Sequence, residues 1–227
     1  MMILHNMLDR IRAFGRLIAK TYKEYDMKYF RKMTGEKCFL SPVSLEDVER
    51  YTEWVNDLEI GQFVLFSSTV FDVDKERTAL QDLMKNSVIF AIVEKDTNKV
   101  IGNCGLHLVN NVHRHAQFGI FIGEKTYWNQ GIGSEATSLI LDYGFNIMNL
   151  NNISLEVVDY NKRAIKCYEK VGFKFVGRRR KYNFMAGEYH DALIYDILAE
   201  DFQSPYVKKT FDYSISDEAG HSKISIV

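Results

Sequence analysis

The chain has 227 residues, of which 46% are hydrophobic and 26% charged, and its formal net charge is −1. This length suits one well-cored domain with appendages, and the balanced charge argues against a nucleic-acid binder built on bulk positive charge. The three cysteines stand singly, which favours reduced thiols in the cytoplasm over a disulfide framework or a zinc site. We therefore expect a cytoplasmic protein without a metal site or a nucleic-acid partner.

The first 36 residues differ from the rest of the chain. Apolar residues recur there at helical spacing with Arg and Lys between them, which predicts a basic, amphipathic helical extension over 1–36. The interspersed charges exclude a transmembrane span and fit poorly with a signal peptide. Two interpretations stay open: the helix packs on its own domain or on a second copy in a homodimer, or it binds a membrane surface or an acidic partner.

Strand-like and helix-like segments alternate from residue 38 onward. Ser44 and Asp47 resemble a capping box with Asp in place of Glu, and Gly172 is typical of a helix C-terminus. The predicted elements are strand 38–40, helices 44–57 and 74–86, strands 88–94, 100–108 and 116–122, helix 131–149, strand 153–158, a short helix ending at Gly172, and strands 173–184 and 189–198. The pattern predicts an α+β or mixed α/β domain over 37–202 with a largely antiparallel sheet, followed by a C-terminal tail at 203–227.

The junction after the strand at 116–122 is the most informative segment. A loop ends there in Gly131-Ile132-Gly133, and an amphipathic helix follows at once. Glycine lets the backbone approach a ligand closely, and the first helical turn offers unpaired N–H groups at the positive end of the dipole. This combination is typical of a site for a pyrophosphate.

A dinucleotide-binding site is one alternative for this loop. The run from Gly131 to Ala136 fits G-x-G-x-x-A, and Glu156 follows near the place where that fold has its ribose-binding acid. However, eight residues separate Ile122 from Gly131, whereas the fingerprint needs the glycine almost directly after the strand. The chain also lacks the repeated strand–helix alternation of a doubly wound sheet, so this alternative is disfavoured.

A second pattern, N-x-x-A-x-x-x-Y-x-x-x-G-F, runs from Asn161 to Phe173. Together with E-K-x-Y-W-x-x-G-x-G-x-E-A at 124–136, it resembles the GNAT N-acetyltransferase superfamily. The branch it resembles contains the ribosomal-protein amino-terminal and the spermidine/spermine acetyltransferases. The resemblance covers roughly 37–202. It implies a splayed sheet, acetyl-CoA as cofactor, and direct attack by a primary amine in a ternary complex.

The resemblance also implies roles for individual residues. The implied ligands of the pyrophosphate are the backbone N–H groups of Gln130, Gly131, Ile132, Gly133 and Ser134. Phe121 and Ile122 would pair with the pantetheine arm where a bulge splays the strand. Asn161 would bind the pantetheine side or simply cap a helix, and Lys166 would bind the 3′-phosphate or simply face solvent.

Tyr168 occupies the position of the general acid that protonates the coenzyme A sulfur. A phenol is protonated at neutral pH and can donate. The general base stays open, because Gln117 stands where relatives often have Glu, and a neutral amide is not a base. The alternatives are a water chain, His113, His115, Glu124, or an amine that arrives neutral. Trp128 also replaces the usual Arg or Gln, so one cation near the phosphates is lost.

The resemblance implies that the acceptor is a small amine, a polyamine or a peptide amino terminus. Trp54, Asp57 and Glu59 lie where relatives wall the acceptor groove, and carboxylates there suit a cationic amine. The basic run at 178–181 points instead to an acidic acceptor, so the sequence does not choose between them. A non-catalytic sensor of coenzyme A, or an interaction module with the same fold, is the alternative to the enzyme.

Overall fold

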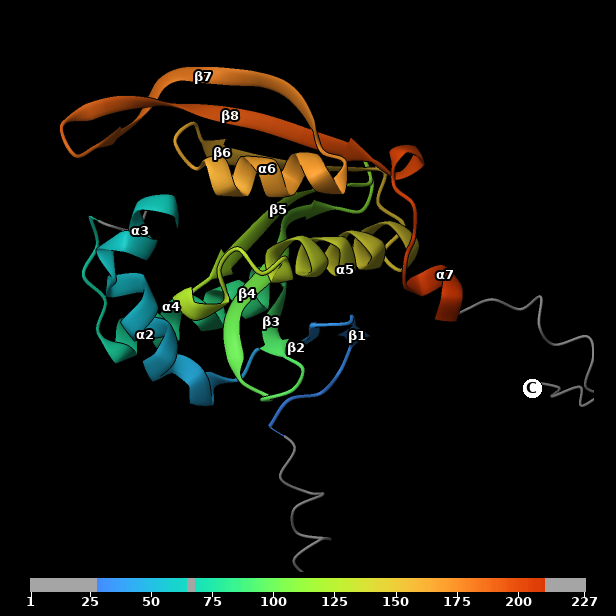
Figure 1. The fold of residues 1–227 in the computed structure, drawn as a ribbon, viewed down its shortest axis with the longest axis horizontal. Helices are drawn as coiled ribbons and strands as arrows, with labels where there is room; N and C mark the ends of the chain where they lie inside the picture. Colours follow the sequence, from blue (N-terminus) through green and yellow to red (C-terminus); the bar gives the residue numbers. More distant parts are fainter. Residues whose placement is uncertain (1–27, 65–67, 211–227) are drawn as a thin grey trace, which may run out of the picture. The chain divides into compact units, whose positions relative to one another are not determined.

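The computed structural model describes residues 28–64 and 68–210 (Figure 1). The chain divides into two compact units, 1–30 and 31–227, and the elements below belong to the second. The helix predicted over 1–36 lies mostly outside the described residues, as does most of the predicted tail. Among the described residues, no helix is long and apolar enough to cross a membrane.

The second unit contains eight strands and several helices in its described part. In chain order they are β1 (Met33–Thr34), β2 (Cys38–Pro42), α2 (Val48–Asn56), α3 (Leu58–Val64), α4 (Val73–Asn86), β3 (Val88–Glu94), β4 (Val100–Asn110), β5 (His115–Ile122), α5 (Ile132–Asn146), β6 (Asn152–Val158), α6 (Lys162–Val171), β7 (Lys174–Met185), β8 (Glu188–Leu198) and α7 (Val207–Thr210). Short 3-10 turns lie at Leu45–Asp47, Lys125–Tyr127 and Ala199–Asp201.

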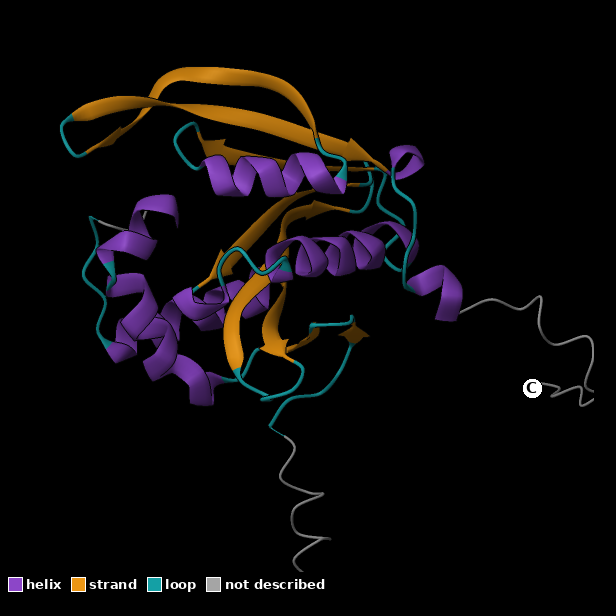
Figure 2. Cartoon of the chain, viewed as in Figure 1, coloured by secondary structure: helices purple, strands orange, loops and turns teal. Residues whose placement is uncertain are grey.

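The strands form one sheet in the order β1-β2-β3-β4-β5-β6-β8-β7. Every neighbouring pair is antiparallel except β5 and β6, which run parallel. Helices flank the sheet (Figure 2). α5 packs on one face, where Tyr143 meets Phe90, and α2 packs on the other, where Trp54 meets Phe121. This confirms the predicted mixed α/β fold with a mostly antiparallel sheet.

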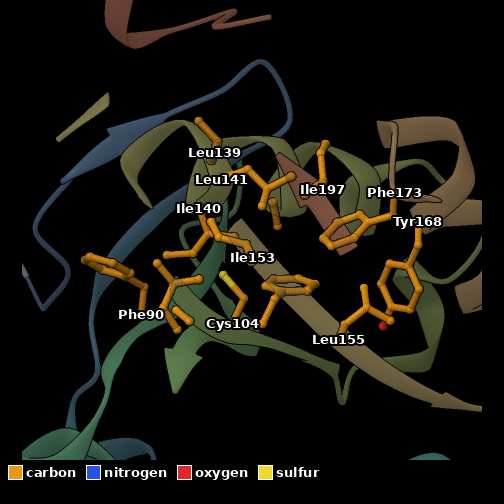
Figure 3. Close-up of a cluster of buried hydrophobic side chains, with 14 of the residues drawn as sticks. Phe90, Cys104, Leu139, Ile140, Leu141, Ile153, Leu155, Tyr168, Phe173 and Ile197 are labelled. Atoms are coloured by element: carbon orange, nitrogen blue, oxygen red, sulfur yellow. The ribbon is translucent and has the colours of Figure 1, made fainter. Parts of the chain in front are cut away.

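The main hydrophobic core lies between this sheet and α5 (Figure 3). Leu139, Ile140 and Leu141 of α5 are fully buried, as is Ile153 of β6. Phe90 and Cys104 of the central strands contribute to the same cluster. Burial of each large aliphatic side chain contributes about 2 kcal/mol, so this contact fixes α5 on the sheet.

Two element boundaries differ from the prediction for local reasons. α5 ends at Asn146 rather than near 149, because the chain reverses at Asn149, which has a left-handed φ of 59°, and Ile147 is exposed. Ser44 caps a 3-10 turn by accepting a hydrogen bond from the Glu46 N–H, and the α-helix begins only at Val48. The sheet also starts before residue 37, with β1 paired to β2.

Asp142 attaches the chain after β8 to α5. Its carboxylate is fully buried and accepts hydrogen bonds from Ser204 Oγ at 2.6 Å and from the N–H groups of Tyr206 and Val207 at 2.8 and 2.9 Å. Asn146 Nδ2 donates a further bond at 2.8 Å. The start of the predicted tail is therefore part of the folded unit.

We predict that Asp142→Asn lowers the free energy of unfolding by about 3 kcal/mol, because an amide group then faces donors that need an acceptor. Denaturant unfolding measures this loss. The exposed Asp74→Asn is the matched control and should stay within about 0.5 kcal/mol of the parent. An equally small loss for Asp142→Asn would contradict the structural role of this carboxylate.

Candidate functional site

The sheet opens between its two parallel strands. β5 and β6 pair at only three positions, His115 with Asn152, Ala116 with Ile153, and Gln117 with Ser154. Beyond Gln117 the two strands no longer pair, although β5 continues to Ile122 and β6 to Val158. The second half of β5 therefore has a backbone edge that no described strand covers.

Backbone direction shows which residues face this opening. The N–H groups of Gly123 and Glu124 both donate to the Ile101 carbonyl of β4, at 3.0 and 3.1 Å, which is the two-against-one pattern of a β-bulge. Because successive residues of a strand point to opposite edges, Ile120 and Ile122 direct their N–H groups into the opening. Trp128 Nε1 donates to the Ile122 carbonyl at 2.9 Å and so fixes the loop to this edge.

The glycine loop begins α5 as the sequence indicates. Gly131 is its N-cap with φ 82°, a left-handed conformation that glycine adopts without strain. The first hydrogen bond within the helix runs from the Glu135 N–H to the Gly131 carbonyl at 3.1 Å. The N–H groups of Ile132, Gly133 and Ser134 thus precede the helical ladder at the positive end of the dipole.

A lysine that the sequence did not indicate lies beside this loop. Lys37 Nζ donates to the Gln130 carbonyl at 2.7 Å. Glu135, in the first turn of α5, accepts the N–H groups of Glu36, Lys37 and Cys38 and so fastens the β1–β2 turn to the helix. The structure therefore supplies a cation near the loop although Trp128 replaces the usual basic residue. No sequence signal could have found Lys37, because it precedes the loop by more than 90 residues.

The opening of the sheet forms part of a large cavity. Its volume is about 1120 Å³, and its lining comes from α2, α3, α4, α5 and α6, from strands β3 to β7, and from the loop before α5. A second depression of about 560 Å³ shares Gly131, Ser134 and Lys170 with it and extends past Lys37 and Tyr206. The two hollows meet at the first turn of α5.

α6 forms one wall of the cavity. Asn161 Oδ1 caps this helix by accepting a hydrogen bond from the Ala164 N–H at 3.2 Å, and Asn161 lines the cavity. Cys167 Sγ lies 3.2 Å from Ser134 Oγ, so α6 contacts the first turn of α5 directly. Lys166 lines the same wall, and Arg163 stacks on the Trp128 ring at 3.7 Å from its centroid.

Tyr168 of α6 lines the cavity, and its side chain lies close to Phe173 in the buried cluster (Figure 3). Its residue is 8% exposed, and its ring packs edge-on against Phe118 and Phe173. Burial, with a smaller contribution from Cys167, raises the pKa of the phenol above its ordinary value. The hydroxyl therefore stays protonated at neutral pH, which is the state a proton donor requires.

The residues that the resemblance places at the acceptor groove do not line this cavity. Trp54 is 5% exposed and packs against Phe121, and a side chain at Gly123 would overlap its ring. Asp57 and Glu59 both bind Lys125, at 2.7 and 2.5 Å. None of Trp54, Asp57 and Glu59 is among the described residues that line the cavity.

The expected bases are also outside the cavity lining. His113 and His115 stack on each other at the β4–β5 turn, with ring centroids 6.4 Å apart and both residues exposed. Glu124 pairs with Arg50. Gln117 is partly buried on β5, at the last position that pairs with β6.

Glu76 and His107 also line the cavity, and the sequence interpretation missed both. Glu76 of α4 is 4% exposed, and burial raises the pKa of its carboxyl to about 7. His107 of β4 is half-buried, and burial lowers its pKa. Glu76 lies on the apolar face of α4 with Leu80 and Leu83. The sequence signal that could have indicated Glu76 was an acidic residue among apolar residues at helical spacing.

Among the described residues, no group of His, Cys, Asp and Glu could hold a metal ion. The cavity offers backbone donors, a buried phenol from α6, a buried carboxyl group from α4 and an imidazole from β4. This arrangement suits acid–base chemistry on a bound thioester or ester, with backbone stabilisation of an oxyanion.

Comparison with known proteins agrees with this geometry. Residues 37–174 match the family described as "Acetyltransferase (GNAT) domain". The uncharacterised N-acetyltransferase p20 of Bacillus licheniformis is 28% identical over 172 residues, 74% of this chain and 96% of that protein. Spermidine N(1)-acetyltransferase of Escherichia coli K12 is 37% identical over 102 residues, which is 45% of this chain and 54% of that protein.

A solved structure shares the fold. Spermidine N-acetyltransferase from Vibrio cholerae, in complex with CoA and spermine, superposes with a TM-score of 0.67 at 24% identity, over 74% of this chain and 98% of that chain. The family match covers more than half of the sequence, and it includes the glycine loop, the opening beside β5 and Tyr168. The chain belongs to the GNAT family of acetyltransferases.

Proposed function

We propose that this enzyme transfers the acetyl group of acetyl-CoA to a primary amine that carries a second positive charge, such as a linear polyamine. The observation that supports this acceptor is Glu76, a buried carboxylate on the cavity wall. None of the ion pairs found between described residues includes it. A buried carboxylate without a cation is costly, and a bound ammonium would relieve that cost.

The shape of the two hollows supports acetyl-CoA as donor. The uncovered edge of β5 offers the N–H groups of Ile120 and Ile122 to the pantetheine arm, as a neighbouring strand would use them. The first turn of α5 would bind the pyrophosphate through Gly133 and Ser134. Lys37 and Lys170 border the second depression, where they would attract the remaining phosphate.

The chain's own residues perform the following tasks. Acetyl-CoA supplies an activated acyl group as a thioester. One of the two N–H groups directed into the opening from β5 would stabilise the developing oxyanion by about 3 kcal/mol, while the other holds the pantetheine arm. Tyr168 would give its phenolic proton to the departing sulfur, and the cap residue Asn161 would hold the pantetheine through Nδ2. The direct transfer needs no covalent enzyme intermediate.

The length of the α4 wall supports an extended acceptor. Glu76 and Ser87 line the cavity near opposite ends of α4, eleven residues apart, which corresponds to about 16 Å of helix. Leu80 and Leu83 lie between them and give the wall an apolar middle. An extended molecule with an apolar stem and amines at both ends matches this wall better than a compact monoamine.

We predict that Tyr168→Phe lowers kcat at least tenfold, because the sulfur then loses its proton donor. The affinity for acetyl-CoA should change less than twofold, since the ring remains. Release of free thiol, followed with a chromogenic thiol reagent, measures the rate, and calorimetric titration measures the affinity. Tyr182→Phe, on the exposed face of β7, is the matched control.

Equal rates for Tyr168→Phe and its parent would contradict the role of the phenol. If the parent itself binds acetyl-CoA but releases no thiol with any polyamine, peptide or amino sugar, the protein is a coenzyme A sensor instead.

We predict that Glu76→Gln raises the KM for a polyamine at least tenfold and leaves the KM for a linear monoamine within about twofold. The pKa of this carboxyl is raised to about 7, so it is neutral below that pH and ionised above it. The parent's KM for a polyamine should therefore rise as the pH falls below about 7, and the variant should lack this dependence. Glu49→Gln, on the exposed surface of α2, is the control.

A uniform rise of KM for both amines would show that Glu76 acts on the fold rather than on the second charge. An unchanged KM for both would remove the support for a dicationic acceptor and favour a peptide amino terminus.

The compartment and the assembly state are also proposals. The three cysteines are unpaired, which suits a reducing, cytoplasmic compartment. β7 lies at the edge of the sheet and exposes Phe175, Val176 and Phe184 by 56, 59 and 62%. An uncovered strand edge with apolar side chains favours pairing with another chain. We propose a second copy of this chain as the partner.

We predict that the full chain elutes as a dimer, with twice its mass of 26.4 kDa by light scattering. Introducing charges by Val176→Lys and Phe184→Lys should shift the protein toward the monomer at micromolar concentration. The exposed Val112→Lys, on the β4–β5 turn, should leave the mass unchanged. A monomeric parent protein would refute the dimer.

A further inference from the structure

The chain needs a group that removes a proton from the acceptor amine, and Gln117 is unable to do so. We propose that His107 is the catalytic general base, taking this proton on Nε2. This inference rests on the proposed acetyl transfer to an amine. Three observations support it: His107 is paired with Gln117 in the β4–β5 register, its ring lies over Gly119, and it contacts Ser87.

His107 lies on the strand next to the opened edge. In the β4–β5 register, His107 is the direct partner of Gln117, so both side chains lie on the same face of the sheet. That face is the one on which Trp54 of α2 packs against Phe121. His107 of the adjacent strand therefore supplies the base that position 117 lacks.

A glycine opens the space in front of the imidazole. A Cβ atom on Gly119 would lie 3.1 Å from His107 Nε2, so the ring extends over β5 at a residue without a side chain. Gly119 immediately precedes Ile120, whose N–H faces the opening. His107, Gly119 and Ile120 all line the same cavity. The arrangement thus brings Nε2 to the part of β5 that would hold the thioester.

Ser87 orients the ring from the other side. His107 Nδ1 lies 2.9 Å from Ser87 Oγ, and the Ser87 N–H caps the end of α4 by donating to the Leu83 carbonyl at 2.9 Å. The tautomer competent as a base is the one in which Nδ1–H donates to Ser87 Oγ. In that tautomer Nε2 carries the free electron pair on the side of Gly119.

The surroundings favour a neutral imidazole. Burial lowers the pKa of His107 below its ordinary value, so the ring is unprotonated at neutral pH. None of the ion pairs found between described residues includes it. The other ionisable groups that line the cavity are Tyr51 of α2, Glu76 and Asp82 of α4, Tyr127 of the loop before α5, Glu156 of β6, and Lys162, Arg163, Lys166, Cys167, Tyr168 and Lys170 of α6.

The proton balance is complete without a further reactant. Nε2 takes one proton from the acceptor ammonium and leaves a neutral amine with a free electron pair. The amine nitrogen forms the C–N bond to the acetyl carbon, and the C–S bond breaks with its electron pair on sulfur. Tyr168 protonates that sulfur and regains a proton from the amide nitrogen through solvent, while His107 releases its proton to solvent.

The test compares His107→Gln with the parent protein and with His115→Gln, which changes an exposed histidine of the neighbouring turn. We expect His107→Gln to lower kcat/KM for a linear monoamine by about 10²- to 10⁴-fold and His115→Gln to leave it unchanged. Adding Gln117→Glu to His107→Gln should restore at least tenfold, because a carboxylate then lies at the position paired with residue 107.

The pH profile separates a catalytic role from a structural one. With a monoamine, so that Glu76 makes no contribution, kcat/KM of the parent should fall at acid pH with a midpoint below 6.5. This limb should disappear in His107→Gln. A variant within twofold of the parent, or a slow variant that keeps the acid limb, overturns the proposal.

Thermal melts and titration with acetyl-CoA verify that His107→Gln folds and binds its donor. If it does not fold, Ser87→Ala provides the test, because it leaves His107 in place and removes the partner of Nδ1. We then expect a several-fold lower rate and a displaced acid limb, and an unchanged limb overturns the proposal. A parent protein that releases no thiol with any amine refutes the proposed function itself, which is a different outcome.

Discussion

The site depends on the early end of pairing between β5 and β6. Three residue pairs hold these parallel strands together, and beyond Gln117 each strand has an unpaired edge. Buried backbone groups need hydrogen-bond partners, so such an edge is costly unless water or a ligand satisfies it. An extended ligand that pairs with Ile120 and Ile122 restores the missing ladder. The main source of donor affinity is therefore backbone geometry, which side-chain substitutions change little.

Helices α5 and α4 supply the parts of the site that the opened sheet lacks. The core under Leu139 and Ile140 fixes α5, so its first turn stays at the end of the opening, and Glu135 ties that turn to the start of the sheet. On the opposite side, α4 adds a wall with charge at one end and Ser87 at the other. In the proposed function, donor and acceptor would meet across β5 from different layers of the fold, which suits direct transfer in a ternary complex.

Sequence reasoning succeeded where the determinants are local. The Gly131 loop and the helix between Asn161 and Gly172 were predictable because cap, apolar stripe and terminating glycine lie within one segment. It missed Lys37 and His107, whose roles depend on strand register and on which helix covers which face. Such contacts join residues that are far apart in sequence. The ion pairs of the two predicted acceptor carboxylates, Asp57 and Glu59, with Lys125 are likewise long-range contacts that the sequence does not indicate.

The central claim is that coenzyme A pairs with the free edge of β5 and with the first turn of α5. Backbone amide NMR of the full chain, titrated with coenzyme A, tests this most directly. We predict that the largest shifts fall on the amides of Ile120, Ile122, Gly133 and Ser134, while amides at the β4–β5 turn change little. Saturating binding that leaves the β5 amides unshifted would contradict the account.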